Sequence, residues 1–217
     1  MSNDMSVQVF LVDDERAVTD GLMWLLESVK IPSRSFDDAD SFVQAVRDVQ
    51  GPVCAVLDLR MPGVSGLELQ QRLVDEGIDL PLIFLSAHGD VPAAVNAMQQ
   101  GAVDFLQKPV NSQAFLNSIN RIVRLARERF ESKQHEDSVQ QKLERLSARE
   151  LEVLGGLLGG KTSKLMARDF DISPKTVDVH RASVMRKLLV SNTAELIKMV
   201  GPLRGSANDS RRRLPKR

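Results

Sequence analysis

The feature that most constrains this chain is a fivefold alternation of short apolar runs and amphipathic stretches in its first 120 residues. The apolar runs lie at about 7–12, 33–36, 53–57, 82–85 and 103–106, and a helical spacing of apolar residues follows each one. Strands that alternate with helices pair in parallel, and short apolar strands are typical of burial on both faces. We therefore predict an α/β domain with a five-stranded parallel sheet and helices on both faces.

The charges of the chain are distributed unevenly, although its formal net charge is zero. Residues 1–120 carry 7 Lys and Arg against 17 Asp and Glu, a net charge of −10. Residues 141–217 carry 17 against 8, a net charge of +9. This division indicates two domains with different partners, and the basic one is a candidate for binding nucleic acid.

Three features exclude other classes of protein. No apolar run approaches the roughly 20 residues that a membrane span needs. The start of the chain, residues 1–4, lacks the basic and apolar segments of a secretory signal. The single cysteine, Cys54, excludes an internal disulfide framework and a cysteine-based zinc site. We expect a cytoplasmic protein without a membrane partner.

Polar residues follow four of the five predicted strands. Asp13 and Asp14 follow the first strand, Asp58 the third, Ser86 the fourth, and Lys108 comes just after the fifth. In parallel sheets these ends meet at one edge, where carboxylates repel each other unless a cation neutralises them. Oxygen ligands favour Mg²⁺, while a lysine and a hydroxyl can contact a phosphoryl group. The pattern predicts a site at which a carboxylate accepts a phosphoryl group.

The basic C-terminal part has the pattern of a small all-α domain. Ser147 and Glu150 form a capping box, and Ser173-Pro174 is a strong helix start. The second and third helices are joined by a short turn, which indicates a helix-turn-helix. The third helix spans about 174–188. A bundle that binds protein is the alternative. The spare face of the third helix carries residues that can meet phosphates or base edges: Lys175, Thr176, Asp178, Val179, Ala182 and Arg186.

Four motifs in the first domain resemble the receiver domain of two-component response regulators. They are Val-Asp-Asp-Glu at 12–15, Asp-Leu-Arg-Met-Pro-Gly at 58–63 with Gly66, Ser-Ala-His at 86–88 and Phe-Leu-Gln-Lys-Pro at 105–109. The resemblance covers residues 6–123. It implies a flavodoxin-like sheet of order 2-1-3-4-5, with Asp58 phosphorylated by a partner histidine kinase.

The same resemblance implies roles for further residues. It implies a Mg²⁺ site made by Asp13, Asp14, Asp58 and the backbone carbonyl of Arg60. It implies that Ser86 and Phe105 act as switch residues beside the invariant Lys108. In this family the bond that corresponds to Lys108-Pro109 is usually cis, so we expect a cis bond here.

Motifs at 146–154, 160–164 and 172–181 resemble the LuxR-type helix-turn-helix, over residues 143–200. With the receiver, they resemble the FixJ/NarL class of transcriptional regulators, closest to the FixJ branch. The third helix would then enter the major groove. Two departures stand out: Ser163 replaces a more common Asn, and Gly155-Gly156 lies inside a helix, where each Gly costs about 1 kcal/mol against Ala. Near bases the resemblance places Asp178, Val179 and Ala182, and near the backbone Lys175, Thr176, His180 and Arg181.

These observations predict a transcription regulator, not an enzyme. We expect a receiver at 6–123, a helical linker at 124–142, a DNA-binding domain at 143–200 and a basic disordered tail at 201–217. Phosphorylation of Asp58 would promote dimerisation through the region 91–105 and binding to promoter DNA, with RNA polymerase as a further partner.

Two alternatives remain open at this stage. The output domain could bind protein or RNA, although Phe170 is the only aromatic residue within 143–200 available to stack on bases. The first domain could be an aspartate-nucleophile phosphohydrolase, although such enzymes usually place a second acid two residues after the nucleophile, where this chain has Arg60.

Overall fold

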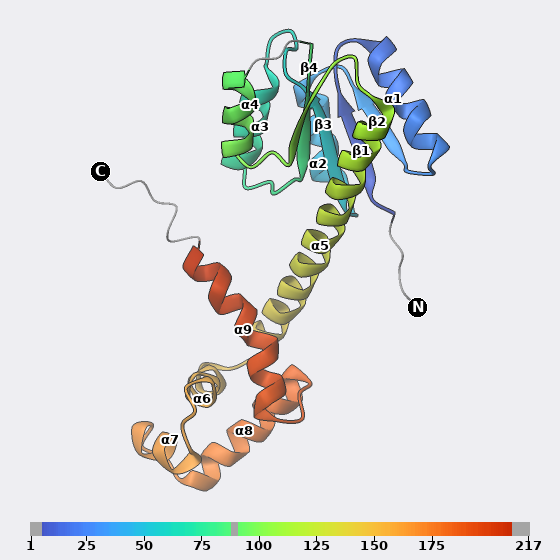
Figure 1. Cartoon of the computed structure of the whole chain (residues 1–217). Helices are drawn as coiled ribbons and strands as arrows, with labels where there is room; N and C mark the ends of the chain where they lie inside the picture. The colour runs from blue at the N-terminus through green and yellow to red at the C-terminus, as the bar shows by residue number, and fades with distance from the viewer. Residues whose placement is uncertain (1–5, 88–90, 210–217) are drawn as a thin grey trace, which may run out of the picture. The chain divides into compact units, whose positions relative to one another are not determined.

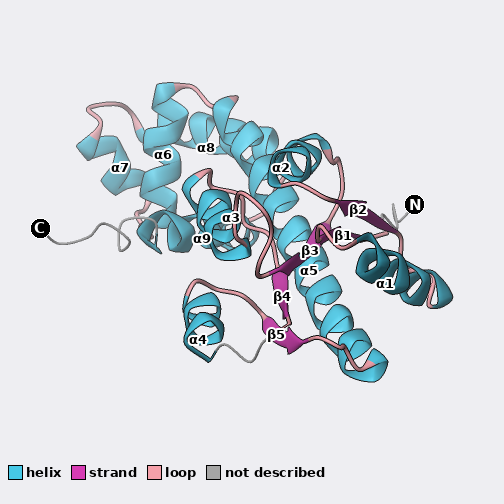
Figure 2. Ribbon diagram, turned by 90° about the horizontal axis from the view of Figure 1, so that it is seen from above, coloured by secondary structure: helices cyan, strands magenta, loops and turns pink. Residues whose placement is uncertain are grey.

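A single parallel sheet organises the N-terminal part of the chain. The computed structural model describes residues 6–87 and 91–209, and for 202–209 it describes the backbone alone. The strands are β1 (Gln8–Val12), β2 (Ser33–Phe36), β3 (Val53–Asp58), β4 (Leu82–Ser86) and β5 (Asp104–Gln107). Their order is β2-β1-β3-β4-β5, with every pairing parallel (Figure 1 and Figure 2). The predicted fold class and strand order are confirmed.

Helices cover both faces of this sheet. On one face lie α1 (Arg16–Ser28) and the start of α5 (Ser112–Glu144), and on the other α2 (Ala39–Asp48), α3 (Gly66–Asp75) and α4 (Val91–Gln99). Successive side chains of a strand point to opposite faces, so β1 contributes to both cores. Val9 and Leu11 pack with α1 and α5, whereas Phe10 and Val12 pack with α2. This arrangement leaves the carboxyl ends of the strands at one open edge.

The C-terminal part is helical. It consists of α6 (Ala148–Leu158), α7 (Ser163–Asp169), α8 (Pro174–Leu188) and α9 (Thr193–Asp209), and Val139 near the end of α5 joins its core. The predicted capping box of Ser147 and Glu150 is present, and Ser173 caps α8 ahead of Pro174. The chain divides into two units, residues 1–131 and 132–217, and each is described by itself.

One helix follows the expected domain plan and another departs from it. The helix α5 continues without a break through residues 124–142, the segment expected to be a helical linker. The backbone of α9 continues to Asp209, into the segment expected to be disordered from residue 201. A helix that has already formed extends at low cost, because each added residue contributes a hydrogen bond. Residues 210–217 of the predicted tail lie outside the described residues.

Candidate functional site

Three carboxylates gather where β1 and β3 end. Asp13 follows β1 directly, and Asp58 is the last residue of β3; both are buried, while Asp14 is exposed. Each offers an oxygen, and these oxygens lie within 4.8 Å of one another. Three negative charges at such spacing repel each other, so the cluster favours a cation. Its all-oxygen ligand set is the type that hard divalent cations prefer.

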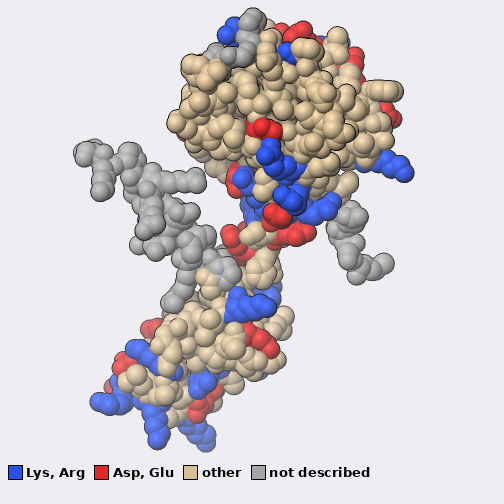
Figure 3. Space-filling model, in the orientation of Figure 1, with Lys and Arg blue, Asp and Glu red and all other residues tan. Residues whose placement is uncertain are grey.

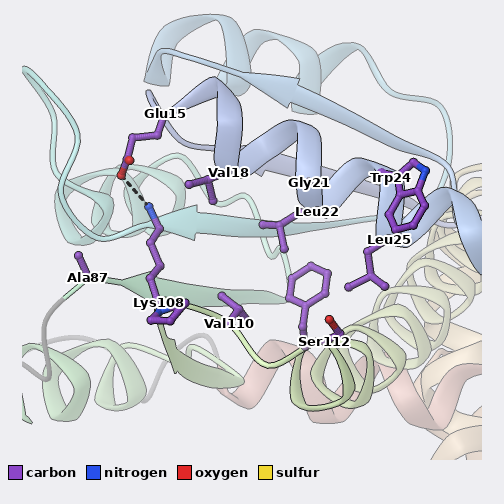
Figure 4. A pocket seen from close by; sticks show the side chains of 12 residues that line it. Glu15, Val18, Gly21, Leu22, Trp24, Leu25, Ala87, Lys108, Val110 and Ser112 are labelled. Carbon is purple, nitrogen blue, oxygen red and sulfur yellow. Dashed lines mark hydrogen bonds and ion pairs between the residues drawn. The ribbon is translucent and has the colours of Figure 1, made fainter.

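Lys108 joins the carboxylates from the loop after β5. Its Nζ lies 2.7 Å from Asp13 Oδ2 and 2.8 Å from Asp58 Oδ1. It also lies 3.3 Å from Glu15 Oε1 (Figure 4). Burial alone would lower the pKa of Lys108, but its bonds to Asp13 and Asp58 outweigh burial and raise the pKa. The amine is therefore a fixed positive charge. The Lys108-Pro109 peptide bond is cis, as the resemblance predicted.

Burial disfavours the ionised form of Asp13. Burial raises its pKa, although the ion pair with Lys108 and the hydrogen bond from the backbone N–H of Glu15 act in the opposite direction. Its Oδ2 is buried and, among the described residues, meets Lys108 only as an ion pair without hydrogen-bond geometry. A positive charge added at this point would stabilise the ionised form.

The other predicted receiver residues lie just after β3, at the end of β4 and on β5. The backbone N–H of Arg60 donates to Asp58 Oδ2 at 2.9 Å. Ser86 is buried at the end of β4, one residue beyond Leu85, the partner of Asp58 in the sheet. The half-buried Phe105 on β5 has its ring centroid 6.3 Å from that of Phe84. His88, part of one motif, lies outside the described residues.

Two residues of this site appear in the sequence analysis only as members of motifs, without a role of their own. Glu15 contacts Lys108 through its side chain and Asp13 through its backbone N–H. Gly66, the first residue of α3, lies so close to Asp58 that an added Cβ would be 2.3 Å from the Asp58 carbonyl oxygen. Only glycine lets α3 approach the site this closely. The signal available in the sequence was the place of Gly66 in the motif that resembles receiver domains.

A pocket of about 660 Å³ opens beside the carboxylates, between α1 and the β5–α5 loop (Figure 4). Glu15 and Lys108 line the end nearest the carboxylates, and apolar side chains line much of the rest. Trp24 on α1 belongs to this lining and is 72% exposed. The lining residues are Glu15, Val18, Gly21, Leu22, Trp24, Leu25, Ala87, Lys108, Pro109, Val110, Ser112 and Phe115.

In the C-terminal unit, α7 and α8 form the helix pair predicted from the sequence. Val177, Val184 and Leu188 of α8 are buried in the core of this unit. The opposite side of α8 faces solvent, and Lys and Arg side chains gather at the end of the unit where α7 and α8 lie (Figure 3). Of the predicted DNA contacts, His180 and Arg181 are half-buried, and these are exposed: Lys175, Thr176, Asp178, Val179, Ala182 and Arg186.

A buried carboxylate also lies between α6 and α8 of the C-terminal unit. Glu150 accepts from Lys187 Nζ at 2.6 Å, from the Ser183 hydroxyl at 2.7 Å and from the backbone N–H of Ser147 at 2.7 Å. These bonds lower its pKa to about 2. Glu150 thus connects the start of α6 to α8.

Comparison with known families agrees with both units. Residues 9–120 match the response regulator receiver domain, and residues 144–200 match the luxR family of bacterial regulatory proteins. Within the described residues, none of the helices is both long and apolar enough to cross a membrane.

Individual relatives match along almost the whole chain. The transcriptional regulatory protein TdiR of Thauera aromatica is 42% identical over 203 residues, 93% of this chain and 88% of that protein. The transcriptional regulatory protein FixJ of Bradyrhizobium diazoefficiens is 38% identical, over 88% of this chain and 93% of that protein.

The solved structure of the response regulator StyR has a TM-score of 0.80 and 39% identity, covering 91% of this chain and 99% of that one. These matches join the same two domains in the same order as the folds described above. The chain therefore belongs to the LuxR-class response regulators, transcriptional regulators that combine a receiver with a helix-turn-helix DNA-binding domain.

Proposed function

We propose that Asp58 accepts a phosphoryl group from the phosphohistidine of a sensor histidine kinase. The observation that carries the proposal is the Lys108 amine, held 2.8 Å from Asp58 Oδ1 and 2.7 Å from Asp13 Oδ2. In the transfer, the phosphorus–nitrogen bond of the donor breaks and a phosphorus–oxygen bond to Asp58 forms. Lys108 then offsets the charge of the phosphoryl oxygens. The chain would act as a phosphoryl acceptor and not as an enzyme with a separate substrate.

The cofactor we propose is Mg²⁺. Asp13, Asp14, Asp58 and the backbone carbonyl of Arg60 would hold it; the three carboxylates offer oxygens within 4.8 Å of one another, and the buried Asp13 Oδ2 makes no hydrogen bond. When bound, Mg²⁺ neutralises the carboxylates and the phosphoryl oxygens. The chain's own part is to hold the ligands in place, which the bond from Arg60 N–H to Asp58 does for the loop after β3.

Phosphorylation would be transmitted through Ser86 and Phe105 to a dimer surface. The Ser86 hydroxyl would donate to a phosphoryl oxygen, and Phe105 would change its position on β5. The strand β5, which carries Phe105, contacts α4, whose apolar side chains Val91, Val95 and Met98 are exposed. Exposed apolar residues on one helix support association of two receivers in the region 91–105.

Two paired C-terminal domains would then bind a two-fold promoter site, with α8 in the major groove and RNA polymerase as the next partner. The exposed Lys175, Val179 and Arg186 support this use of α8. We keep 6–123, 124–142 and 143–200 as the proposed receiver, linker and DNA-binding segments, with a basic tail at 201–217 whose first part, to Asp209, continues α9. We propose the cytoplasm as the location of the chain.

Labelling with a small phosphodonor tests the proposal. Wild-type protein with acetyl phosphate and Mg²⁺ should gain the mass of one phosphoryl group and shift toward dimer in gel filtration. Asp58→Asn should gain none. Asp14→Ala should lose Mg²⁺-dependent labelling, because few protein ligands hold this ion. The control is Asp75→Asn, an exposed carboxylate on α3 that should be labelled like wild type. Equal labelling of Asp58→Asn would overturn the assignment.

A further inference from the structure

The side chains of Ser163, Asp178 and Arg181 contact one another at the surface of the helix-turn-helix. The Ser163 hydroxyl, at the start of α7, donates to Asp178 Oδ1 at 2.7 Å. It also accepts from Arg181 Nη1 at 2.7 Å, and Arg181 Nη1 lies 3.9 Å from the same Asp178 oxygen. Asp178 and Arg181 are one turn apart on α8. Ser163 on α7 therefore bonds to Asp178, an exposed side chain of α8, and connects the two helices.

The bond from Ser163 fixes the orientation of the Asp178 carboxylate. A serine hydroxyl has one proton to donate, and in Ser163 that proton is used on Asp178. The Asp178 side chain is 63% exposed, and its Oδ2 makes no hydrogen bond within the described residues. Its free oxygen is thus fixed in direction by Ser163 and remains available to a ligand beyond the protein surface.

A carboxylate at this place is unusual for a surface that meets DNA, because phosphates repel it. It accepts hydrogen bonds only, and the major-groove donor that suits a carboxylate is the amino group of cytosine. Arg181 offsets part of its charge at 3.9 Å. Val179, the next residue on α8, is 62% exposed and would present an apolar side chain to the same groove.

We propose that Ser163 is a positioning residue for sequence recognition, which holds Asp178 so that it accepts from a cytosine amino group at one position of each half-site. This rests on the proposed function, namely that α8 reads the major groove. The proposal separates Ser163 from residues that contact phosphates. A phosphate contact changes binding to all sequences alike, whereas a lost positioning contact changes the preference at one base pair.

The test uses the full chain, activated with acetyl phosphate and Mg²⁺, and a library of randomised DNA duplexes. Wild type should select a two-fold site with cytosine at one fixed position of each half. Ser163→Ala and Asp178→Ala should each lose about tenfold of the preference at that position, as expected for a base contact. The double variant should lose no more than Asp178→Ala alone, because the two residues act as a unit. Ser163→Thr keeps the hydroxyl and should keep the preference.

Controls keep folding and charge apart from recognition. Ser163→Ala leaves the cap of α7 intact, because Thr162 provides it. Asp169→Ala removes one negative charge from the same helix, where Asp169 pairs with Lys161, and should leave base preferences unchanged. Circular dichroism of each variant verifies folding.

The outcomes separate the two proposals. A wild-type protein that selects no sequence would overturn DNA reading by α8 and this proposal with it. Selection by wild type, with an unchanged cytosine preference in Ser163→Ala, would overturn only the role of Ser163. So would equal weakening of all duplexes by Ser163→Ala with a lower salt dependence, because that result identifies a phosphate contact.

Discussion

The two units each bury a carboxylate beside a lysine, and they treat it in opposite ways. Glu150 in the C-terminal unit receives bonds from Lys187, Ser183 and Ser147, and its pKa is lowered to about 2. Asp13 in the receiver shares Lys108 with Asp58, and burial raises its pKa. A saturated carboxylate stabilises a fold, whereas an under-bonded one keeps binding capacity for a cation. The comparison assigns Glu150 a role in stability and Asp13 a role in binding a cation.

The largest expected effect is the loss of Glu150. Glu150→Ala leaves Lys187 and Ser183 without their acceptor and should destabilise the C-terminal unit by about 3 kcal/mol. Hydrogen–deuterium exchange, read from peptides of residues 132–217, measures this. The control is Glu152→Ala: Glu152 is an exposed neighbour paired with Arg149, and its loss should cost less than about 1 kcal/mol. Equal costs would show that Glu150 is an ordinary surface charge.

The second effect has the opposite sign. Asp13→Asn relieves a buried negative charge and should stabilise the receiver by on the order of 1 kcal/mol, measured by exchange in peptides of residues 1–131. The same variant should lose Mg²⁺-dependent labelling of Asp58. Asp14→Asn removes the same charge from an exposed position and should leave stability nearly unchanged. Destabilisation by Asp13→Asn would place Asp13 with Glu150 as a structural carboxylate.

The smallest effect concerns acid. The folded pKa of Glu150, about 2, lies below its unfolded value of about 4.3, so its stabilisation is complete above that value and is lost as the pH falls toward 2. The raised pKa of Asp13 means that its ionisation opposes folding and that this opposition disappears on protonation.

Between pH 6 and pH 3, urea denaturation should therefore show both variants approaching wild type from opposite sides, and the Glu150→Gln gap should close mainly below about pH 4.3. Glu150→Gln starts below wild type in stability, and Asp13→Asn starts above it. Gaps that stay constant with pH would contradict the two pKa shifts.

Local patterns predicted the fold and most of the receiver site. Strand ends brought Asp13, Asp58 and Lys108 together because parallel strands share an edge, so their order along the chain was sufficient information. Contacts between distant side chains were outside the reach of such patterns. The bond from Ser163 to Asp178 and the approach of Gly66 to Asp58 depend on how helices pack, which no local spacing encodes.

The glycine pair in α6 shows the same limit. Gly155 and Gly156 carry an equal expected cost from propensity alone. In the structure, a Cβ on Gly156 would lie 2.3 Å from Met166 Sδ, whereas one on Gly155 would meet nothing within 4 Å. A side chain at position 156 would therefore have to displace Met166 of α7, whereas one at position 155 would not.

The exposed Trp24 has a spectroscopic consequence. The chain contains one tryptophan and no tyrosine, so its intrinsic fluorescence arises almost wholly from one indole on α1 of the receiver. Emission therefore reports on solvent at the pocket that Trp24 lines and is blind to local events on α8. A change in emission when duplex DNA is added would measure communication between the two units, without any attached dye.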